Sequence, residues 1–204
     1  MSLIYPSYFP NIANCITIIQ SKTICFEIED NYQKQTFRNR CYIYGANGKL
    51  GLHIPVNYTQ KRRQKTKDIR IDNSSKWNSI HYKSIESAYR TSPFFEFYED
   101  DFQSLFNNKS EWLMDYNFQC IDLIQQCLDV DFGYKTSTTF EKEVEDDFRP
   151  LINVKNHEHI QTNPYIQVFE NKHGFINNLS ILDVLFNLGP ETHSYLLNHP
   201  SINV

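Results

Sequence analysis

Alternating apolar and polar positions dominate the first third of the chain and predict β-structure. Residues 23–28 form one alternating segment, and residues 40–44 and 50–56 form two more. The last two are joined by Gly-Ala-Asn-Gly at 45–48, and Asn-Gly readily adopts the positive φ that a tight reversal needs. We therefore expect a β-rich N-terminal part built around a hairpin, with a short helix over 11–20 before it.

From Ser75 onward the apolar spacing changes to three and four residues, which is typical of helices. One helix is predicted to end before Pro93, a second to carry Pro93 in its first turn, and a third to be capped by Ser110. A later helix begins at the Ser-x-x-acid pattern of Ser180 and ends at Gly189. Short strands are also expected at 68–71, 134–140 and 165–169. The fold class is mixed α/β (α+β), with a β-rich part followed by a cluster of helices.

Length and composition fit one compact domain over residues 1–204, because 204 residues with 40% hydrophobic content can bury a sizeable core. The net charge of -4 argues against nucleic acid as a partner. No apolar run approaches a membrane-spanning length. Five cysteines without a CxxC pair fit a reducing cytoplasm better than a disulfide framework. The 15 Phe and 13 Tyr suit either a well-filled interior or the apolar face of a homodimer.

The densest polar segment lies between the first strand and the hairpin. It contains Tyr32, Gln33, Lys34, Arg38, Asn39 and Arg40. Two arginines can bind carboxylate or phosphate bidentately, and Lys34 adds a point charge. The structural alternative is an ion-paired turn, in which Arg38 or Arg40 is answered by Glu27 or Asp30. Both interpretations stand on the sequence alone.

His81 lies on the apolar seam of the first long helix, one turn from Trp77. A histidine there is either a hydrogen-bonded core residue or a general base whose titration suits proton transfer. Tyr89 completes such a site or simply occupies the same helix. The basic run 61–67 is likewise either a solvated loop or a loop that contacts phosphate.

Other candidates for chemistry are weaker. The pair His157 and His159 lacks an identifiable third ligand, so no metal site is expected. Cys41 after Arg40 is either an activated thiolate or, more in keeping with a strand, a small buried residue. Glycine-rich phosphate loops and the Gly-x-Ser-x-Gly elbow do not occur in the sequence. The identity of any cofactor therefore cannot be predicted from motifs.

Several segments together resemble the WbqC-like protein family. They are Tyr-Pro-Ser-Tyr-Phe-Pro at 5–10, the block 27–39, Arg-Cys-Tyr-Ile-Tyr-Gly-Ala-Asn-Gly at 40–48, Ile-Pro-Val at 54–56, 68–72, Trp77, 81–95 and 180–190. The similarity extends over nearly the whole chain in order. Three positions depart from the family pattern: Asn11, Asp30 and Tyr82.

The resemblance implies a bacterial protein, with motifs most like those of Bacteroidetes, that takes part in O-antigen or other surface-polysaccharide biosynthesis. It implies a transferase that tailors an amino sugar by acyl or aminoacyl transfer, with a nucleotide sugar or activated acyl donor as small-molecule substrate. Positions carried over from the motifs are Tyr32, Lys34, Arg38, Asn39, Arg40, Trp77, His81 and Tyr89. On this hypothesis His81, Tyr32 and Lys34 are catalytic and the others bind substrate. The alternatives are a non-catalytic binding module for a phosphorylated sugar, carrier or nucleic acid, and a structural partner that uses its aromatic second helix.

Overall fold

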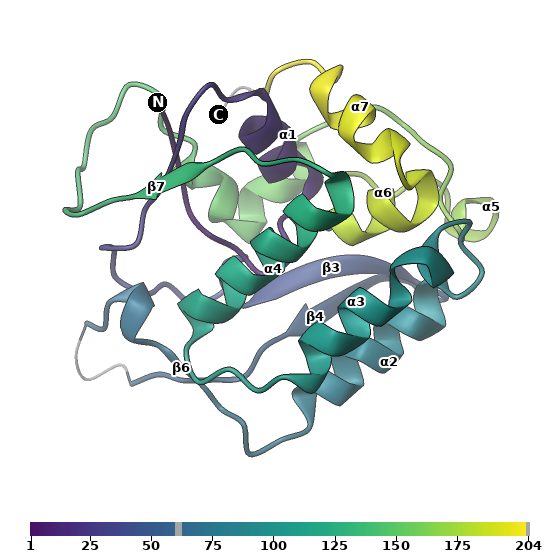
Figure 1. Cartoon of the computed structure of the whole chain (residues 1–204), viewed down its shortest axis with the longest axis horizontal. Coiled ribbons are helices and arrows are strands. Elements are labelled where there is room, and N and C mark those ends of the chain that lie inside the picture. Colours follow the sequence, from purple (N-terminus) through teal and green to yellow (C-terminus); the bar gives the residue numbers. More distant parts are fainter. Residues whose placement is uncertain (60–62, 203–204) are drawn as a thin grey trace.

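The computed structural model describes residues 1–59 and 63–202, without the side chains of 156–158. It shows the expected mixed α/β fold, in which small sheets lie among helices (Figure 1). A three-stranded parallel sheet joins β1 (Ser2–Ile4), β2 (Ile24–Phe26) and β7 (Tyr134–Thr136) in the order β1-β2-β7. Because the strands are parallel, their carboxyl ends meet at one edge of the sheet.

Helix α1 (Ile12–Gln20) connects β1 to β2, as the sequence predicts. It begins there because the side chain of Asn11 accepts a hydrogen bond from the backbone N–H of Asn14 at 2.9 Å, which satisfies one of the free amides of the first turn. Seven of its residues are buried. The helix therefore belongs to the core and fixes the segment 5–10 beneath the hairpin.

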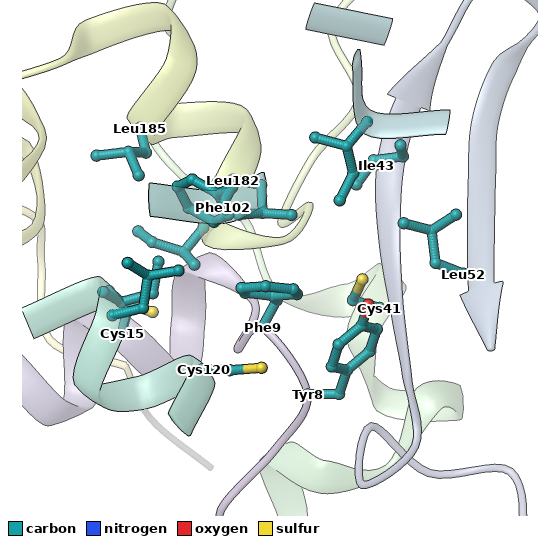
Figure 2. Close-up of a cluster of buried hydrophobic side chains, with 14 of the residues drawn as sticks. Tyr8, Phe9, Cys15, Cys41, Ile43, Leu52, Phe102, Cys120, Leu182 and Leu185 are labelled. Atoms are coloured by element: carbon teal, nitrogen blue, oxygen red, sulfur yellow. The ribbon is translucent and has the colours of Figure 1, made fainter. Parts of the chain in front are cut away.

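The predicted hairpin is confirmed as β3 (Arg40–Gly45) and β4 (Gly48–His53). Gly48 takes the positive φ of the reversal, 98°. Side chains alternate across the ribbon, and Cys41, Ile43 and Leu52 point into the core beside Tyr8 (Figure 2). The residues between them on β3 point the other way. The second arm stops earlier than expected, and β5 (Val56–Asn57) pairs with β6 (Arg70–Ile71) instead.

The three adjacent helices are also confirmed. They are α2 (Trp77–Tyr89), α3 (Phe95–Asn107) and α4 (Leu113–Leu128). Helices α2 and α3 lie side by side in Figure 1. The aromatic face of α3 is buried, with Phe95 and Phe102 fully covered. It is therefore part of the core and is not available as the contact face of a structural partner.

The C-terminal part contains short helices: α5 (Glu170–His173), α6 (Ile181–Leu188) and α7 (Glu191–Leu197). As predicted, Ser180 caps α6 and Gly189 ends it with a φ of 54°. The remaining described elements are short 3-10 helices: η1 (Thr66–Asp68), η2 (Arg149–Ile152) and η3 (Val154–His159).

Three local predictions are wrong. Residues 165–169 do not form a strand, because Tyr165 and Gln167 turn inward to donate hydrogen bonds to the buried carboxylate of Asp183 at 2.6 and 2.9 Å. Ser110 does not cap α4; its hydroxyl donates to the carbonyl of Trp112 instead. Pro93 does not lie in the first turn of α3, which begins at Phe95; it belongs to the turn before that helix.

Within the described residues, none of the helices combines the length and the apolar character needed to cross a membrane.

Candidate functional site

The guanidinium of Arg38 is an internal group of the fold. The residue is fully buried, and its Nη2 donates to Asp30 Oδ2 at 2.5 Å. A second nitrogen reaches Thr36 Oγ1 at 3.2 Å, and the plane lies 4.0 Å from the ring centre of Tyr5. The other oxygen of Asp30 accepts from Thr66 Oγ1 at 2.7 Å. The ion-paired turn is thus the correct interpretation at Arg38.

Arg40, two residues further on, has a different environment. It is half-buried, and in the register of the hairpin it lies directly opposite His53 on β4. Its Nε is buried without a hydrogen-bond partner, and within residues 1–59 and 63–202 no carboxylate forms an ion pair with it. A cation held in this way has donors to offer to an anion that is not part of the protein.

Lys34, Tyr58 and Tyr32 form a chain of contacts that ends at Tyr32, whose phenol feels the charge of Arg40. The Lys34 Nζ is 5.1 Å from the ring centre of Tyr58, and that ring is 5.2 Å from the ring of Tyr32. Burial raises the pKa of Tyr32, and the charge of Arg40 opposes that rise, which places the guanidinium close to the phenol. Tyr32 is buried whereas Lys34 is exposed, so the lysine can reach a ligand and the phenol supports the surface from below.

His53 and Tyr42 extend this surface along the hairpin. Tyr42 shares the outward face of β3 with Arg40, and the edge of the His53 ring meets it at a centroid distance of 6.4 Å. We call the surface formed by Lys34, Arg40, Tyr42, His53 and Tyr58 the cationic face. It carries cations and aromatic rings, the groups that bind phosphates and flat or apolar ligand surfaces.

The imidazole of His53 is the group of the cationic face best suited to accept a proton. Its pKa is lowered, first by partial burial and then by the charge of Arg40, against a smaller opposing effect of a hydrogen bond to Gly51. The ring lies over Gly51, where a Cβ would come within 2.7 Å of His53 Cε1. The ring is therefore neutral at pH 7. It can lie this close to the strand because Gly51 has no side chain.

His53 does not stand out in the sequence as a functional residue, although a signal for it exists. Once the Gly-Ala-Asn-Gly reversal fixes the register, Arg40 pairs with His53 directly. Counting outward from the turn would have placed an imidazole opposite the arginine.

His81 lies behind the hairpin and not on the cationic face. It is 4% exposed, its Nδ1 is 2.9 Å from the hydroxyl of Tyr8, and it forms a further hydrogen bond to the backbone of His53. Burial lowers its pKa to about 4. Trp77 packs against it with a ring separation of 5.2 Å. The imidazole thus ties α2 and the N-terminal segment to β4.

The remaining predicted residues are also internal. Asn39 is buried and donates to the carbonyl of Ile54 at 2.8 Å, while Tyr89 is fully buried and donates to Asp183 at 2.7 Å. Of the eight positions carried over from the family motifs, the structure brings Lys34 and Arg40 to one surface, with the buried Tyr32 beneath it. Those in the core are Arg38, Asn39, Trp77, His81 and Tyr89.

Two other predictions concern neighbouring segments. In the basic run 61–67, residues 61 and 62 lie outside the described residues, and Lys65 and Lys67 both pair with Glu29. Cys41 is buried, and burial raises the pKa of its thiol, so it is the small buried strand residue and not a thiolate. The described part of the chain holds no group of three or more His, Cys, Asp or Glu side chains arranged to bind a metal ion; the side chain of His157 lies outside it.

Comparison with known proteins gives one positive result. The family model described as WbqC-like protein family matches residues 5–162, which include β2 to β7 and the whole cationic face. No curated protein and no solved structure matches the chain. Since the match covers well over half of the sequence and confirms the resemblance drawn from its motifs, the chain belongs to the WbqC-like protein family.

Proposed function

We propose that this protein is a transferase-type tailoring enzyme of bacterial surface-polysaccharide (O-antigen) biosynthesis, and that the cationic face binds the anionic part of its activated donor. The biological setting is the one that the resemblance to the WbqC-like family implies, and the chain belongs to that family. The observation that carries the site is Arg40, whose guanidinium lacks a carboxylate partner within the described residues.

The donors on the cationic face suit a phosphate or carboxylate group. The planar fork of Arg40 matches two oxygens of such an anion, and Lys34 adds a mobile ammonium. The rings of Tyr42 and Tyr58 provide flat apolar surface beside the charges. A nucleotide sugar or an activated acyl donor such as a coenzyme A ester combines both requirements.

His53 supplies the proton transfer in this proposal. With an acyl donor, its neutral imidazole accepts the proton of an acceptor amine or hydroxyl as that nucleophile bonds to the carbonyl carbon of the acyl group. The imidazolium then returns the proton to the leaving group as the old bond breaks. Arg40, beside the ring, stabilises the negative charge of the intermediate oxygen.

His81 takes a positioning role in this scheme. Its hydrogen bond to the backbone of His53 holds the end of β4, and its burial keeps it from direct contact with substrate. The prediction that His81 is itself the general base has not been tested, and the scheme separates the two histidines. Loss of the His53 ring should lower kcat at least 100-fold with little change in donor affinity, whereas His81→Gln should affect stability as well.

The first experiment is a thermal-shift and calorimetric panel with UDP-N-acetylglucosamine and acetyl-coenzyme A as probes. Arg40→Gln should weaken binding of the preferred probe at least tenfold, because a charge-assisted pair is lost. The matched control is Arg70→Gln, which removes an exposed arginine that is paired with Glu111. This variant should bind within twofold of the wild type.

Turnover distinguishes an enzyme from a binding module. If the preferred probe binds through Arg40 but is not consumed in the presence of amino-sugar acceptors, the cationic face is a capture site and the transferase proposal is wrong. Equal binding by Arg40→Gln and wild type would remove the cationic face from the proposal altogether.

A further inference from the structure

A second group of polar side chains lies at the carboxyl edge of the parallel sheet, apart from the cationic face. Tyr5 follows β1, Glu27 follows β2 and Ser137 follows β7. In sheets of this kind the space beyond the carboxyl ends of the strands is the usual place for a ligand. Here a cleft of about 310 Å³ lies over the sheet face formed by Leu3, Cys25 and Lys135 and reaches Glu27 and Ser137 at that edge.

Glu27 is the central residue of this edge. Its side chain is fully buried. Oε1 accepts two hydrogen bonds, from the backbone N–H of Glu29 and from the hydroxyl of Ser137, each at 2.7 Å. Oε2 has no hydrogen-bond partner, and Arg149 Nη1 is 3.7 Å away. The carboxylate is thus held rigidly by one oxygen while the other lacks a donor.

The neighbouring cations are already engaged with other carboxylates. Arg149 forms a bidentate pair with Asp147 at 2.7 and 2.8 Å, and its remaining donors reach the carbonyls of Glu141 and Lys142. Arg38 is paired with Asp30. Glu27 therefore has only the long ion pair to Arg149 at 3.7 Å, and its Oε2 accepts no hydrogen bond. A buried charge in this state is costly unless a cation or a donor completes it.

The cleft has the chemistry to supply such a partner from solution. Its wall combines the charged side chains of Glu27, Lys135 and Glu141 with the hydroxyls of Ser137, Thr138 and Thr139. Hydroxyl groups donate to and accept from other hydroxyls, and the carboxylates favour a positive centre. The volume is at the small end of the range for ligand sites and fits a molecule of a few carbon atoms to about one ring.

We propose that this cleft binds a small hydroxylated primary amine, whose ammonium group pairs with Glu27 Oε2 and whose hydroxyls contact the Ser137–Thr139 segment. The inference is independent of the cationic face, since it rests on different side chains and predicts a ligand of opposite charge. Lys135, which is exposed on the adjacent strand, is the internal competitor for the same carboxylate.

The test uses two probes that differ in one group, serinol and glycerol. Serinol has an ammonium where glycerol has its central hydroxyl. Calorimetry or ligand-observed NMR on the full chain should show serinol binding at least tenfold more tightly than glycerol. Binding should fall at a pH high enough to deprotonate the amine. Equal affinities, or no binding of serinol at 100-fold the protein concentration and above, would mean that Lys135 or a water completes Glu27, and would overturn the proposal.

Variants identify the residue responsible. Glu27→Gln, which keeps the shape, should reduce serinol affinity to the level of glycerol. The matched control is Glu141→Gln at the exposed rim, which should change the serinol affinity less than threefold. An equal loss of affinity in both variants would indicate general charge attraction and would contradict the site. Arg40→Gln should leave serinol binding unchanged, so the failure of one proposal is distinguishable from the failure of the other. Should Glu27→Gln not fold, the wild-type comparison of serinol with glycerol still decides.

Discussion

Arg38 and Arg40 are chemically identical and only two residues apart, yet the fold gives them opposite roles. Arg38 is fully buried and paired with Asp30, whereas Arg40 is half-buried and carries a buried Nε without a partner. The first lies in the turn before β3, where the chain folds back over Tyr5, and the second is the first residue of β3. The comparison teaches that a cluster of cations in a sequence is not one site.

The two histidines repeat the contrast on either side of the same hairpin. His81 lies on the inner side with its ring against Trp77 and Tyr8, while His53 lies on the outer side next to Arg40. A hydrogen bond from the ring of His81 to the backbone of His53 joins the two residues. The inner side therefore supplies rigidity and the outer side supplies accessible groups.

The strongest way to break this comparison is to remove the inner pair. Arg38→Met leaves the carboxylate of Asp30 buried without its cation, and we expect a loss of about 3–5 kcal/mol in the free energy of unfolding. Urea denaturation followed by circular dichroism measures it. Arg70→Met, in which an exposed arginine leaves Glu111, is the control and should change stability by less than about 1 kcal/mol.

A double variant sharpens the result. Combining Arg38→Met with Asp30→Asn removes both charges, and it should recover part of the stability lost in the single variant because no uncompensated carboxylate remains. If the single variant instead unfolds at the same urea concentration as the wild type, the buried pair does not organise the turn and the contrast between the two arginines has no energetic basis.

The next effect is a pH dependence that originates from the inner histidine. The pKa of His81 falls from 6.5 in the unfolded chain to about 4 in the fold. Between these values the unfolded state binds more protons, so stability is complete above pH 6.5 and is lost as the pH falls toward 4. The shift corresponds to about 3 kcal/mol over that range.

Comparison of wild type with His81→Gln isolates this contribution. The difference in unfolding free energy between the two should shrink as the pH falls from 7 to 4, because only the wild type carries the buried imidazole. NMR of the imidazole nitrogens provides an independent check, because His81 should remain neutral at pH 5. A His81 ring that titrates near 6.5 would show that it is accessible to solvent and would return it to the role of general base.

Much of the fold could be predicted because local signals and tertiary packing agree. The Gly-Ala-Asn-Gly reversal, the spacing of α2 to α4 and the start and stop residues of α6 all act within a few positions. Residues 165–169 were misread because their alternation serves another purpose: Tyr165 and Gln167 reach the buried Asp183 of α6. The conformation of that segment depends on a carboxylate distant in sequence, and the periodicity of the segment carries no information about such a contact.

The candidate site was predictable only in part for the same reason. The sequence places Tyr32, Lys34 and Arg40 in one polar block, and the structure keeps Lys34 and Arg40 at one surface with the buried Tyr32 beneath it. It does not reveal that Asp30 lies against Arg38, since that contact depends on the path of the loop. Glu27 appears in the sequence as a partner for an arginine, and only the fold shows that its second oxygen accepts no hydrogen bond.

The smallest expected effect is also the one that separates the two arginines most clearly. Arg40→Met removes a guanidinium that stabilises no carboxylate within the described residues, and the methionine can cover the same strand surface with its apolar chain. We therefore expect the unfolding free energy to change by no more than about 0.5 kcal/mol. The same variant should bind the donor at least tenfold more weakly. Arg40→Met thus mainly affects binding, whereas Arg38→Met mainly affects stability. If Arg40→Met instead lowers the unfolding free energy by about 2 kcal/mol or more, the loss approaches that for breaking a buried ion pair. Arg40 would then be a structural residue, and the cationic face would have no free arginine with which to hold an anion.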